Sequence, residues 1–380
     1  MLNLIKLKEN NELNILNKVN YFKSPSYIYV PIISEATFKL DDYVYKNTYF
    51  DKYISSISGY IKDTKMVRIN NNLVSTIKIA NDFKENSKIK RKKKSVKNID
   101  DLIIILNEYH LEEISNKILA IKNKKTLVVT AVDEEEYSIK EFIRLSENYS
   151  EILDTMDNLA NILDIKKIIL ATKNTNFKSI KNVKSIIGTY PNVLVRLLPD
   201  KYLISYKPFL CEYLNINDNS TIVLTTNEIY EIYYILNKSK DICETLITVS
   251  GNAIEKSLVI NVRLYTSLEE VIKEYIKFNT NEYAIFINGY LSGKKADDIK
   301  EIIITKDINS IVINKIEEDN ETECINCGAC IKICPVHINA KSCYFKKMSH
   351  KNCIGCGLCS YICPANLKLK EIVSSDNEKL

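Results

Sequence analysis

The sequence predicts a multidomain chain that combines α+β and α/β units and ends in a small cysteine-rich domain. Two observations carry this prediction. Short apolar runs of strand length alternate with segments of helical period through the middle of the chain, which is typical of α/β layers. Nine of the 11 cysteines lie between positions 324 and 363, so the last part of the chain has a chemistry of its own. A chain of 380 residues is long enough for roughly two to four domains.

Composition and charge exclude several classes of protein. Hydrophobic residues make up 46% and charged residues 27%, which is ordinary for a globular chain. The net charge of +5 is too small to indicate a nucleic-acid partner. No stretch approaches the ~20 apolar residues of a membrane span, and the start of the chain lacks the apolar core of a secretory signal. We therefore expect a cytoplasmic protein, in which closely spaced cysteines indicate metal rather than disulfides.

The first part of the chain predicts a small β unit over residues 21–70 and a basic linker over residues 71–99. Residues 27–30 alternate in the manner of a strand, and residues 56–61 are typical of a tight turn between strands. The basic residues of the linker are Lys88, Lys90, Arg91, Lys92, Lys93, Lys94 and Lys97. RNA or an anionic membrane could attract such a run, but it has no interleaved aromatic residues and no apolar helix face. We interpret it as solvated.

The middle of the chain predicts an α/β domain over residues 100–245 and a β-grasp-like unit over residues 246–314. In the α/β domain, apolar strands at 127–129, 167–170, 193–195 and 222–224 alternate with helices, which favours a largely parallel sheet. A long helix is expected over 139–159, and the stretch 108–114 also reads as helix. In the second unit we expect strands at 246–249, 259–262 and 284–287, with a helix at 268–276.

The last unit, residues 315–372, carries the motif C-x2-C-x2-C-x3-C-P twice, which is the bacterial ferredoxin pattern for a cubane iron–sulfur cluster. In two-cluster domains the fourth cysteine of each run binds the other cluster. The predicted ligands of the first [4Fe–4S] cluster are Cys324, Cys327, Cys330 and Cys363. Those of the second are Cys353, Cys356, Cys359 and Cys334. Structural zinc is the alternative, but a zinc site needs only four ligands, and eight in a doubled run argue against it.

The other cysteines and the histidines are expected to bind nothing: Cys343, Cys211, Cys243, His337, His350 and His110. Cys343 fits neither run, and Cys211 and Cys243 are interpreted as core residues. His337 and His350 are placed in solvated loops, and His110 on an amphipathic helix where it packs. We find no spacing that predicts a catalytic side chain.

The order of these units resembles the C subunit of the Rnf electron-transport complex, a family related to the flavin subunit of respiratory complex I. The doubled cysteine run is the specific part of the resemblance. Weaker matches are residues 56–61, residues 248–252, the pair Gly289 and Gly293, and residues 190–191. The resemblance implies a biotinyl-like, barrel-sandwich N-terminal unit, a flavin-subunit-like α/β domain, a β-grasp unit of the SLBB type and a ferredoxin domain.

The resemblance also implies FMN and NADH, but the nucleotide site departs from the family pattern. The family has a Gly-rich loop, whereas residues 107–125 contain no glycine. Glycines there let the backbone approach phosphates. Asp133 and Glu135 are acidic residues at positions that match the family's flavin site. Further carboxylates surround them and would repel a phosphate. Our hypothesis is that FMN and NADH binding has been lost and that Asp133 and Glu135 mark a degenerate site.

The sequence thus predicts an RnfC-like electron carrier with two [4Fe–4S] clusters. It would pass electrons between a soluble donor and a partner flavoprotein or membrane complex, with peripheral attachment to the cytoplasmic membrane face. This makes it a subunit of an oxidoreductase rather than a complete enzyme. Two alternatives remain open: an active NADH:acceptor oxidoreductase, acting on ferredoxin or cobalamin, with a remodelled flavin site, and a scaffold subunit whose clusters are structural.

Overall fold

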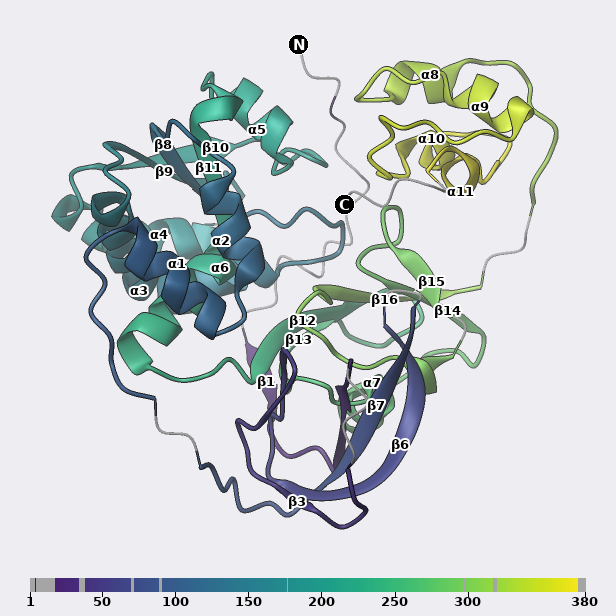
Figure 1. Ribbon diagram of the computed structural model, residues 1–380. Helices are drawn as coiled ribbons and strands as arrows, with labels where there is room; N and C mark the ends of the chain where they lie inside the picture. Colours follow the sequence, from purple (N-terminus) through teal and green to yellow (C-terminus); the bar gives the residue numbers. More distant parts are fainter. Residues whose placement is uncertain are drawn as a thin grey trace.

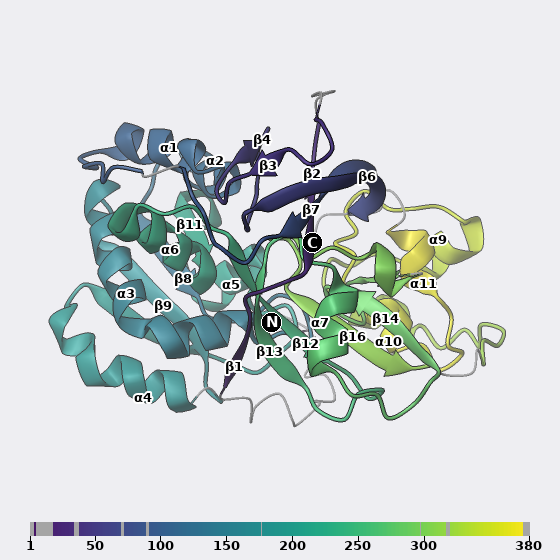
Figure 2. The same cartoon turned by 90° about the horizontal axis from the view of Figure 1, so that it is seen from below.

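The computed structural model describes residues 4, 18–33, 38–69, 72–88, 91–175, 177–296, 298–316 and 320–374. An N-terminal β unit, a parallel α/β layer, a second β-rich unit and a helical C-terminal unit follow one another in the chain. Figure 1 shows the α/β layer in blue and teal at upper left, the C-terminal unit in yellow at upper right, and the β-rich units below them. Figure 2 shows the strands β12, β13 and β14 between the α/β layer and the C-terminal helices.

The N-terminal β unit is built on a long hairpin of β6 (Gly59–Ile69) and β7 (Asn72–Asn81). A four-stranded sheet has the order β2-β7-β6-β3, with β2 (Tyr27–Pro31) and β3 (Tyr43–Val44) at its edges. A smaller hairpin joins β4 (Tyr49–Phe50) to β5 (Tyr53–Ile54). The expected turn at 56–61 overlaps the connection between β5 and β6. Gly59 lies where a Cβ would meet the carbonyl oxygen of Ala80 at 1.8 Å.

The linker expected over residues 71–99 differs from the structure in its first part, because β7 occupies residues 72–81. The alternating apolar residues Ile77 and Ile79 are fully buried in the β unit, and this burial makes the segment a strand. Part of the basic run is not simply solvated either. Arg91 forms a salt bridge with Asp241 (2.7 Å), and Lys94 forms one with Glu108. Lys90 lies outside the described residues.

The α/β layer confirms the expected parallel sheet. Its strand order is β10-β9-β8-β11, and all three pairings are parallel. The strands are β8 (Thr126–Thr130), β9 (Lys167–Lys173), β10 (Val193–Leu198) and β11 (Thr221–Thr225). The helices are α1 (Ile99–Glu108), α2 (Glu112–Leu119), α3 (Lys140–Ile162), α4 (Phe177–Ile186), α5 (Lys207–Tyr213) and α6 (Thr226–Tyr233), and short 3-10 turns cover Ile187–Thr189 and Asp218–Ser220. A π-helical turn, Tyr234–Lys238, extends α6.

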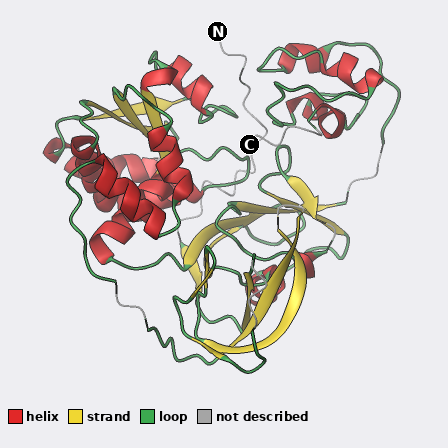
Figure 3. Ribbon diagram, in the orientation of Figure 1, coloured by secondary structure: helices red, strands yellow, loops and turns green. Residues whose placement is uncertain are grey.

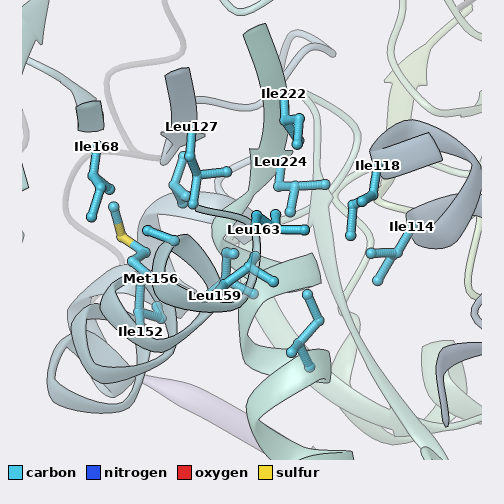
Figure 4. Packing of buried hydrophobic residues seen from close by; sticks show 14 of the residues in the cluster. Ile114, Ile118, Leu127, Ile152, Met156, Leu159, Leu163, Ile168, Ile222 and Leu224 are labelled. Carbon is cyan, nitrogen blue, oxygen red and sulfur yellow. The ribbon is translucent and has the colours of Figure 1, made fainter. Parts of the chain in front are cut away.

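One face of this sheet forms the largest described apolar core. Figure 4 shows Ile152, Met156 and Leu159 of α3 packed beneath strand residues such as Leu127 and Ile222. The spacing of the α3 residues places them on one side of the helix, which explains why the helix lies on the sheet. The N-terminus of α6 is closed by a capping box, in which Thr225 and Glu228 each satisfy a backbone N–H of the other.

The helix expected at 108–114 is interrupted, which corrects both that prediction and the placement of His110 on a helix. His110 has a left-handed φ of 53° and lies in the turn between α1 and α2. Its ring packs on Tyr49 with 4.8 Å between centroids. Leu111 at the turn is buried in the core, and the chain must reverse there for both α1 and α2 to pack on the sheet.

A six-stranded mixed sheet follows, with the order β1-β13-β12-β16-β14-β15. Its strands are β1 (Val19–Phe22), β12 (Glu244–Ser250), β13 (Leu258–Arg263), β14 (Tyr283–Ile287), β15 (Lys294–Ala296) and β16 (Ser310–Lys315). Helix α7 (Leu268–Tyr275) packs on this sheet, and Ile299–Glu301 form a 3-10 turn. β1 pairs in parallel with β13, so residues 19–22 belong to this sheet rather than to the N-terminal β unit.

The C-terminal unit consists of four short helices joined by loops (Figure 3). They are α8 (Ala329–Ile333), α9 (Ala340–Lys346), α10 (Leu358–Tyr361) and α11 (Leu369–Val373). Its apolar core is small and includes Ile338, Leu367 and Leu369, with most of the cysteines packed against it. No described helix of the chain is both long and apolar enough to cross a membrane.

Candidate iron–sulfur centre

The first three cysteines of the first run line one pocket of the C-terminal unit. Cys324, Cys327 and Cys330 surround it, and Cys363 from the end of the second run completes the set. Gly328 precedes α8 with a left-handed φ of 71°, a conformation that places the loop around the pocket before the helix begins at Ala329.

The second pocket has the same construction with the roles of the two runs exchanged. It is lined by Cys353, Cys356 and Cys359 of the second run and by Cys334 of the first. Gly357 has a φ of 73°, close to that of its counterpart Gly328. The two pockets are similar in size, with about 390 Å³ and about 370 Å³ of empty space, part of it open to solvent. The internal repeat in the sequence therefore becomes a repeat in three dimensions.

The crossing of the fourth cysteines follows from helix geometry. Cys330 and Cys334 are four residues apart along α8 and its C-cap, and Cys359 and Cys363 are related in the same way around α10. Four residues of α-helix rise about 6 Å and return to the same face. Each short helix therefore runs between the two pockets and supplies one cysteine to each.

The donor set fits a cubane cluster better than a single ion. Among the described residues, no three His, Cys, Asp or Glu side chains converge as they would on one metal ion. A cubane does not need such convergence, because each thiolate binds a different iron atom. Backbone N–H groups also donate to the sulfurs, from Ile338 to Cys334 Sγ at 3.2 Å and from Gly355 to Cys353 Sγ at 3.4 Å. Such bonds stabilise sulfur that carries negative charge.

Burial shapes the chemistry of the second pocket most strongly. Removal from water raises the pKa of the Cys356 and Cys359 thiols to about 12. These thiols ionise at neutral pH only if a strong Lewis acid such as iron binds the sulfur. The same residues are therefore poor candidates for nucleophilic or redox-active free thiols.

The two pockets differ in their surroundings. At the first, Cys327 is exposed. At the second, Ile354, Cys356 and Leu358 are buried in an apolar cluster that includes Tyr202 and Leu210 of the α/β layer. The hydroxyl of Tyr202 donates to the Cys356 carbonyl oxygen at 3.0 Å. The second pocket is therefore packed against another unit of the molecule, and the first has one exposed cysteine.

A polar junction joins three units beside the second pocket. The Glu136 carboxylate, from the loop after β8, accepts hydrogen bonds from the N–H groups of Leu291 and Ser292 and from the Ser292 hydroxyl. Lys370, which lines the second pocket, donates to the carbonyl oxygens of Ser292 (2.6 Å) and Gly293 (2.7 Å). The loop before β15 is thus held from both sides.

Asp133 and Glu135 lie in the same loop as Glu136, at the carboxyl edge of the parallel sheet. The carboxylates of both residues accept hydrogen bonds from other groups of the protein. Asp133 accepts from Ser138 Oγ at 2.6 Å and from the N–H of Glu141 at 3.3 Å. Glu135 accepts from Asn309 Nδ2 at 2.8 Å. Burial raises the pKa of both carboxyl groups. Neither residue lines a cysteine pocket.

The remaining sequence candidates lie apart from the cysteine pockets. Cys211 and Cys243 are buried core residues, as predicted. Cys343 lies in α9 and lines neither pocket. His337 is exposed, and the ring of His350 accepts a bond from the N–H of Asn352.

Sequence reasoning missed three residues around the second pocket: Tyr202, Glu136 and Lys370. Tyr202 has no signal in the sequence, because it lies 154 positions from the residue it contacts. Glu136 was visible only as one of several acids.

Comparisons with known proteins agree with this site. A 4Fe-4S binding domain family matches residues 318–338, and a second 4Fe-4S binding domain family matches residues 350–366. The chain is 24% identical over 245 residues to the C subunit of the ion-translocating oxidoreductase complex of Buchnera aphidicola subsp. Acyrthosiphon pisum, which covers 60% of this chain and 51% of that protein. It is 24% identical over 231 residues to the C subunit of the proton-translocating ferredoxin:NAD(+) oxidoreductase complex of Clostridium ljungdahlii, covering 57% and 50%.

The chain thus spans about half the length of the curated relatives it matches. Among solved structures, it is similar to a chain of an NAD+-reducing [NiFe]-hydrogenase in the air-oxidized state, with 11% identity and a TM-score of 0.48 over 59% of this chain and 48% of that one. The doubled cysteine run and the sequence similarity together make this protein a divergent, RnfC-like relative of these C subunits, with two 4Fe–4S-binding segments.

Proposed function

We propose that this protein is an iron–sulfur electron-transfer subunit that passes single electrons through two [4Fe–4S] clusters. The observation that carries the proposal is the pair of similar pockets, each lined by four cysteines drawn from both runs. The proposed ligands of the first cluster are Cys324, Cys327, Cys330 and Cys363. Those of the second are Cys353, Cys356, Cys359 and Cys334.

The protein's own part in this function is to hold and shield the clusters, which supply the one-electron chemistry when bound. Apolar side chains such as Ile354 and Leu358 exclude water from the second pocket. Lower solvent access and hydrogen bonds to sulfur are the means by which a protein sets cluster potential. The short helices α8 and α10 hold the two pockets side by side, which favours electron exchange between them.

The proposal includes loss of FMN and NADH binding. The stretch 107–125 corresponds to the Gly-rich loop of the family, and here Ile114 and Ile118 of α2 point into the core (Figure 4). At the carboxyl edge of the sheet, where α/β folds usually bind nucleotides, the protein's own polar groups engage Asp133, Glu135 and Glu136. A phosphate there would meet buried carboxylates instead of free N–H groups.

We also propose finer identities and boundaries for the units. A β-grasp-like unit over 246–314 is supported by the order β13-β12-β16-β14, in which the first and last of its strands in sequence are parallel neighbours. The antiparallel strands within 21–70 support a biotinyl-like unit, and the parallel sheet within 100–245 supports a flavin-subunit-like domain. The linker would then shrink to the residues between β7 and α1, and 315–372 would be the ferredoxin unit.

The partners proposed for this subunit are other electron-transfer subunits or a flavoprotein, with peripheral attachment to a membrane complex on the cytoplasmic face. The names of the relatives, which are subunits of ion- or proton-translocating oxidoreductase complexes, support this assignment. On this basis the protein is one part of an oxidoreductase rather than a complete enzyme.

The deciding experiment is anaerobic purification with iron, sulfide and flavin quantified together, followed by redox titration. We expect about eight iron and eight sulfide per chain, no flavin, and two reversible one-electron transitions by electron paramagnetic resonance. Stoichiometric FMN, or cluster reduction by NADH, would favour the oxidoreductase alternative with a remodelled flavin site. Clusters that are present but cannot be reduced reversibly would favour a structural scaffold.

A further inference from the structure

We propose that the apolar face beside the first cluster is the docking surface for a small acidic one-electron carrier protein. This inference rests on the proposed function and adds the side of the molecule and the class of partner. We call this surface the cluster-1 face and define it by Ile325, Phe345, Lys341, Lys346 and Lys347.

The apolar centre of the cluster-1 face is unusually exposed. Ile325 and Phe345 both line the first pocket, and they are 66% and 59% exposed. Two large apolar side chains at the mouth of one pocket form a patch rather than isolated exposed residues, and such patches mark interaction sites. Cys327 is exposed on the same pocket, so a partner covering the patch would come close to the cluster.

None of the four cysteines that line the second pocket is exposed, whereas Cys327 of the first pocket is. Cys356 is 8% exposed, and its neighbours Ile354 and Leu358 are buried against the α/β layer. Electron transfer between proteins needs close approach, so exchange with another protein should occur at the first cluster. The second cluster then serves as an internal electron reservoir or relay.

The charge around the patch selects the partner. Lys341 lines the first pocket, and Lys346 and Lys347 follow Phe345 directly and are exposed. Residues 320–374 contain seven lysines and three glutamates, and one of those, Glu321, accepts a bond from the Tyr344 hydroxyl. A positive rim around an apolar centre favours an acidic partner and speeds its association at low salt.

A lipid surface would also be attracted by lysines and apolar residues, but it fits the geometry less well. A membrane lying on the cluster-1 face would cover Cys327 and close the open approach to the clusters. A protein carrier uses the same face without blocking electron transfer. In the exchange, one electron leaves the first cluster, which is oxidised, and one redox centre of the carrier is reduced, with no bond made or broken.

The test uses the full, cluster-loaded chain, reduced anaerobically and mixed with oxidised carriers in a stopped-flow instrument. Acidic flavodoxin is the matching probe, basic cytochrome c is the charge-reversed probe, and methyl viologen is a small mediator that needs no docking. The variants are Ile325→Glu, Phe345→Glu and the double variant Lys346→Glu/Lys347→Glu. Leu73→Glu, an equally exposed leucine on β7 (62% exposed), is the matched control.

We expect the second-order rate constant with flavodoxin to fall at least tenfold in each cluster-1 variant and to stay unchanged in Leu73→Glu. The wild-type rate with flavodoxin should fall as salt rises. In the lysine double variant, iron content and the viologen rate should be unchanged, because Lys346 and Lys347 do not line the pocket, so this variant separates docking from cluster binding.

Three results would overturn the docking surface alone. The first is a fall in the flavodoxin rate in Leu73→Glu as large as in the cluster-1 variants, and the second is a higher wild-type rate with cytochrome c than with flavodoxin. The third is that the cluster-1 face binds phosphatidylserine vesicles or a second copy of the chain and that exchange with the carrier is then lost. Absence of electron exchange even with methyl viologen would overturn the proposed function as well.

Discussion

The C-terminal unit and the carboxyl edge of the parallel sheet are the two regions for which the sequence raised the question of a cofactor, and they are built in opposite ways. In the C-terminal unit, the chain wraps around two spaces and lines each with four cysteines. At the sheet edge, the protein's own groups engage the acidic side chains of Asp133, Glu135 and Glu136. The cysteines thus face a space in each pocket, whereas the acids at the sheet edge are hydrogen-bonded to other groups of the protein.

The same contrast appears on a smaller scale between the two cysteine pockets. Their local geometry is nearly the same, with Gly328 and Gly357 at φ values of 71° and 73°. Their surroundings differ, because only the second is packed against the α/β layer and the loop before β15.

The largest effect is expected from the crossed cysteines. Cys363→Ser should remove the first cluster and leave the second, whereas Cys334→Ser should remove the second and leave the first. Each variant should lose about half of the iron. Electron paramagnetic resonance of the reduced proteins should show two different remaining signals. Cys343→Ser is the matched control and should keep all iron. Loss of the same signal in both variants would contradict the crossed assignment.

A smaller effect should separate the two glycines. In Gly328→Ala the added Cβ would have no neighbouring atom within 4 Å, so the free energy of unfolding should fall only by the cost of a left-handed alanine, about 1–2 kcal/mol. Gly357→Ala should lose the same amount of stability from its left-handed backbone. Its Cβ would in addition clash with the carbonyl oxygen of Leu291, at 2.4 Å. Overpacking of this kind adds about 1–3 kcal/mol. Denaturant unfolding of the two cluster-loaded variants measures the difference. Equal losses of stability would mean that the second pocket is not tightly docked.

The acidic sheet edge predicts a pH dependence. Burial, together with the charge of Asp133, raises the pKa of Glu141 to about 7, while the unfolded value is near 4. The native state therefore binds more protons between these values, and its stability falls as the pH rises through that window. We expect the free energy of unfolding to be about 1–3 kcal/mol lower at pH 8 than at pH 5 from this source.

Glu141→Gln tests this pH dependence directly. The amide oxygen of Gln keeps an acceptor for Thr226 and Asn227, which donate to Glu141 at 2.7 and 2.8 Å, and it removes the charge. The variant should gain stability relative to wild type at pH 8 and lose that advantage at pH 5. Since the clusters are present in both proteins, their own pH response cancels in the comparison. An advantage that does not change with pH would contradict the assignment.

The smallest effect is expected from Lys370. Lys370 lines the second pocket and carries a positive charge, so Lys370→Met should lower the potential of the second cluster by on the order of tens of millivolts while the potential of the first cluster changes less. Lys368→Met, a nearby lysine that lines neither pocket, is the control. Redox titration resolves the two potentials. A shift confined to the first cluster would reverse the assignment of inner and outer clusters.

Much of the fold could be predicted because local pattern and final position agree. The predicted strands at 127–129 and 222–224, and the strand at 167–170 after its first residue Lys167, are continuous apolar runs, which suit a sheet buried on both faces, and the structure has them in parallel. The helix over 139–159 was visible from its apolar period. The break at His110 was missed because a left-handed turn leaves no distinct local signal. Strand β7 was missed although its apolar residues alternate, and its pairing with both β2 and β6 is visible only in the structure.

The sequence by itself determined the chemistry of the C-terminal unit, because cluster binding depends on cysteines a few residues apart along the chain. Only the tertiary structure decided what surrounds each pocket. Tyr202 bonds to Cys356 of the second pocket, and Glu136 holds the loop at Leu291, each across more than 150 positions of sequence. It also decided that the acids of the sheet edge bond to Asn309 and Ser292 instead of facing a ligand. Such contacts follow from how the units pack, and packing brings together residues that no local spacing connects.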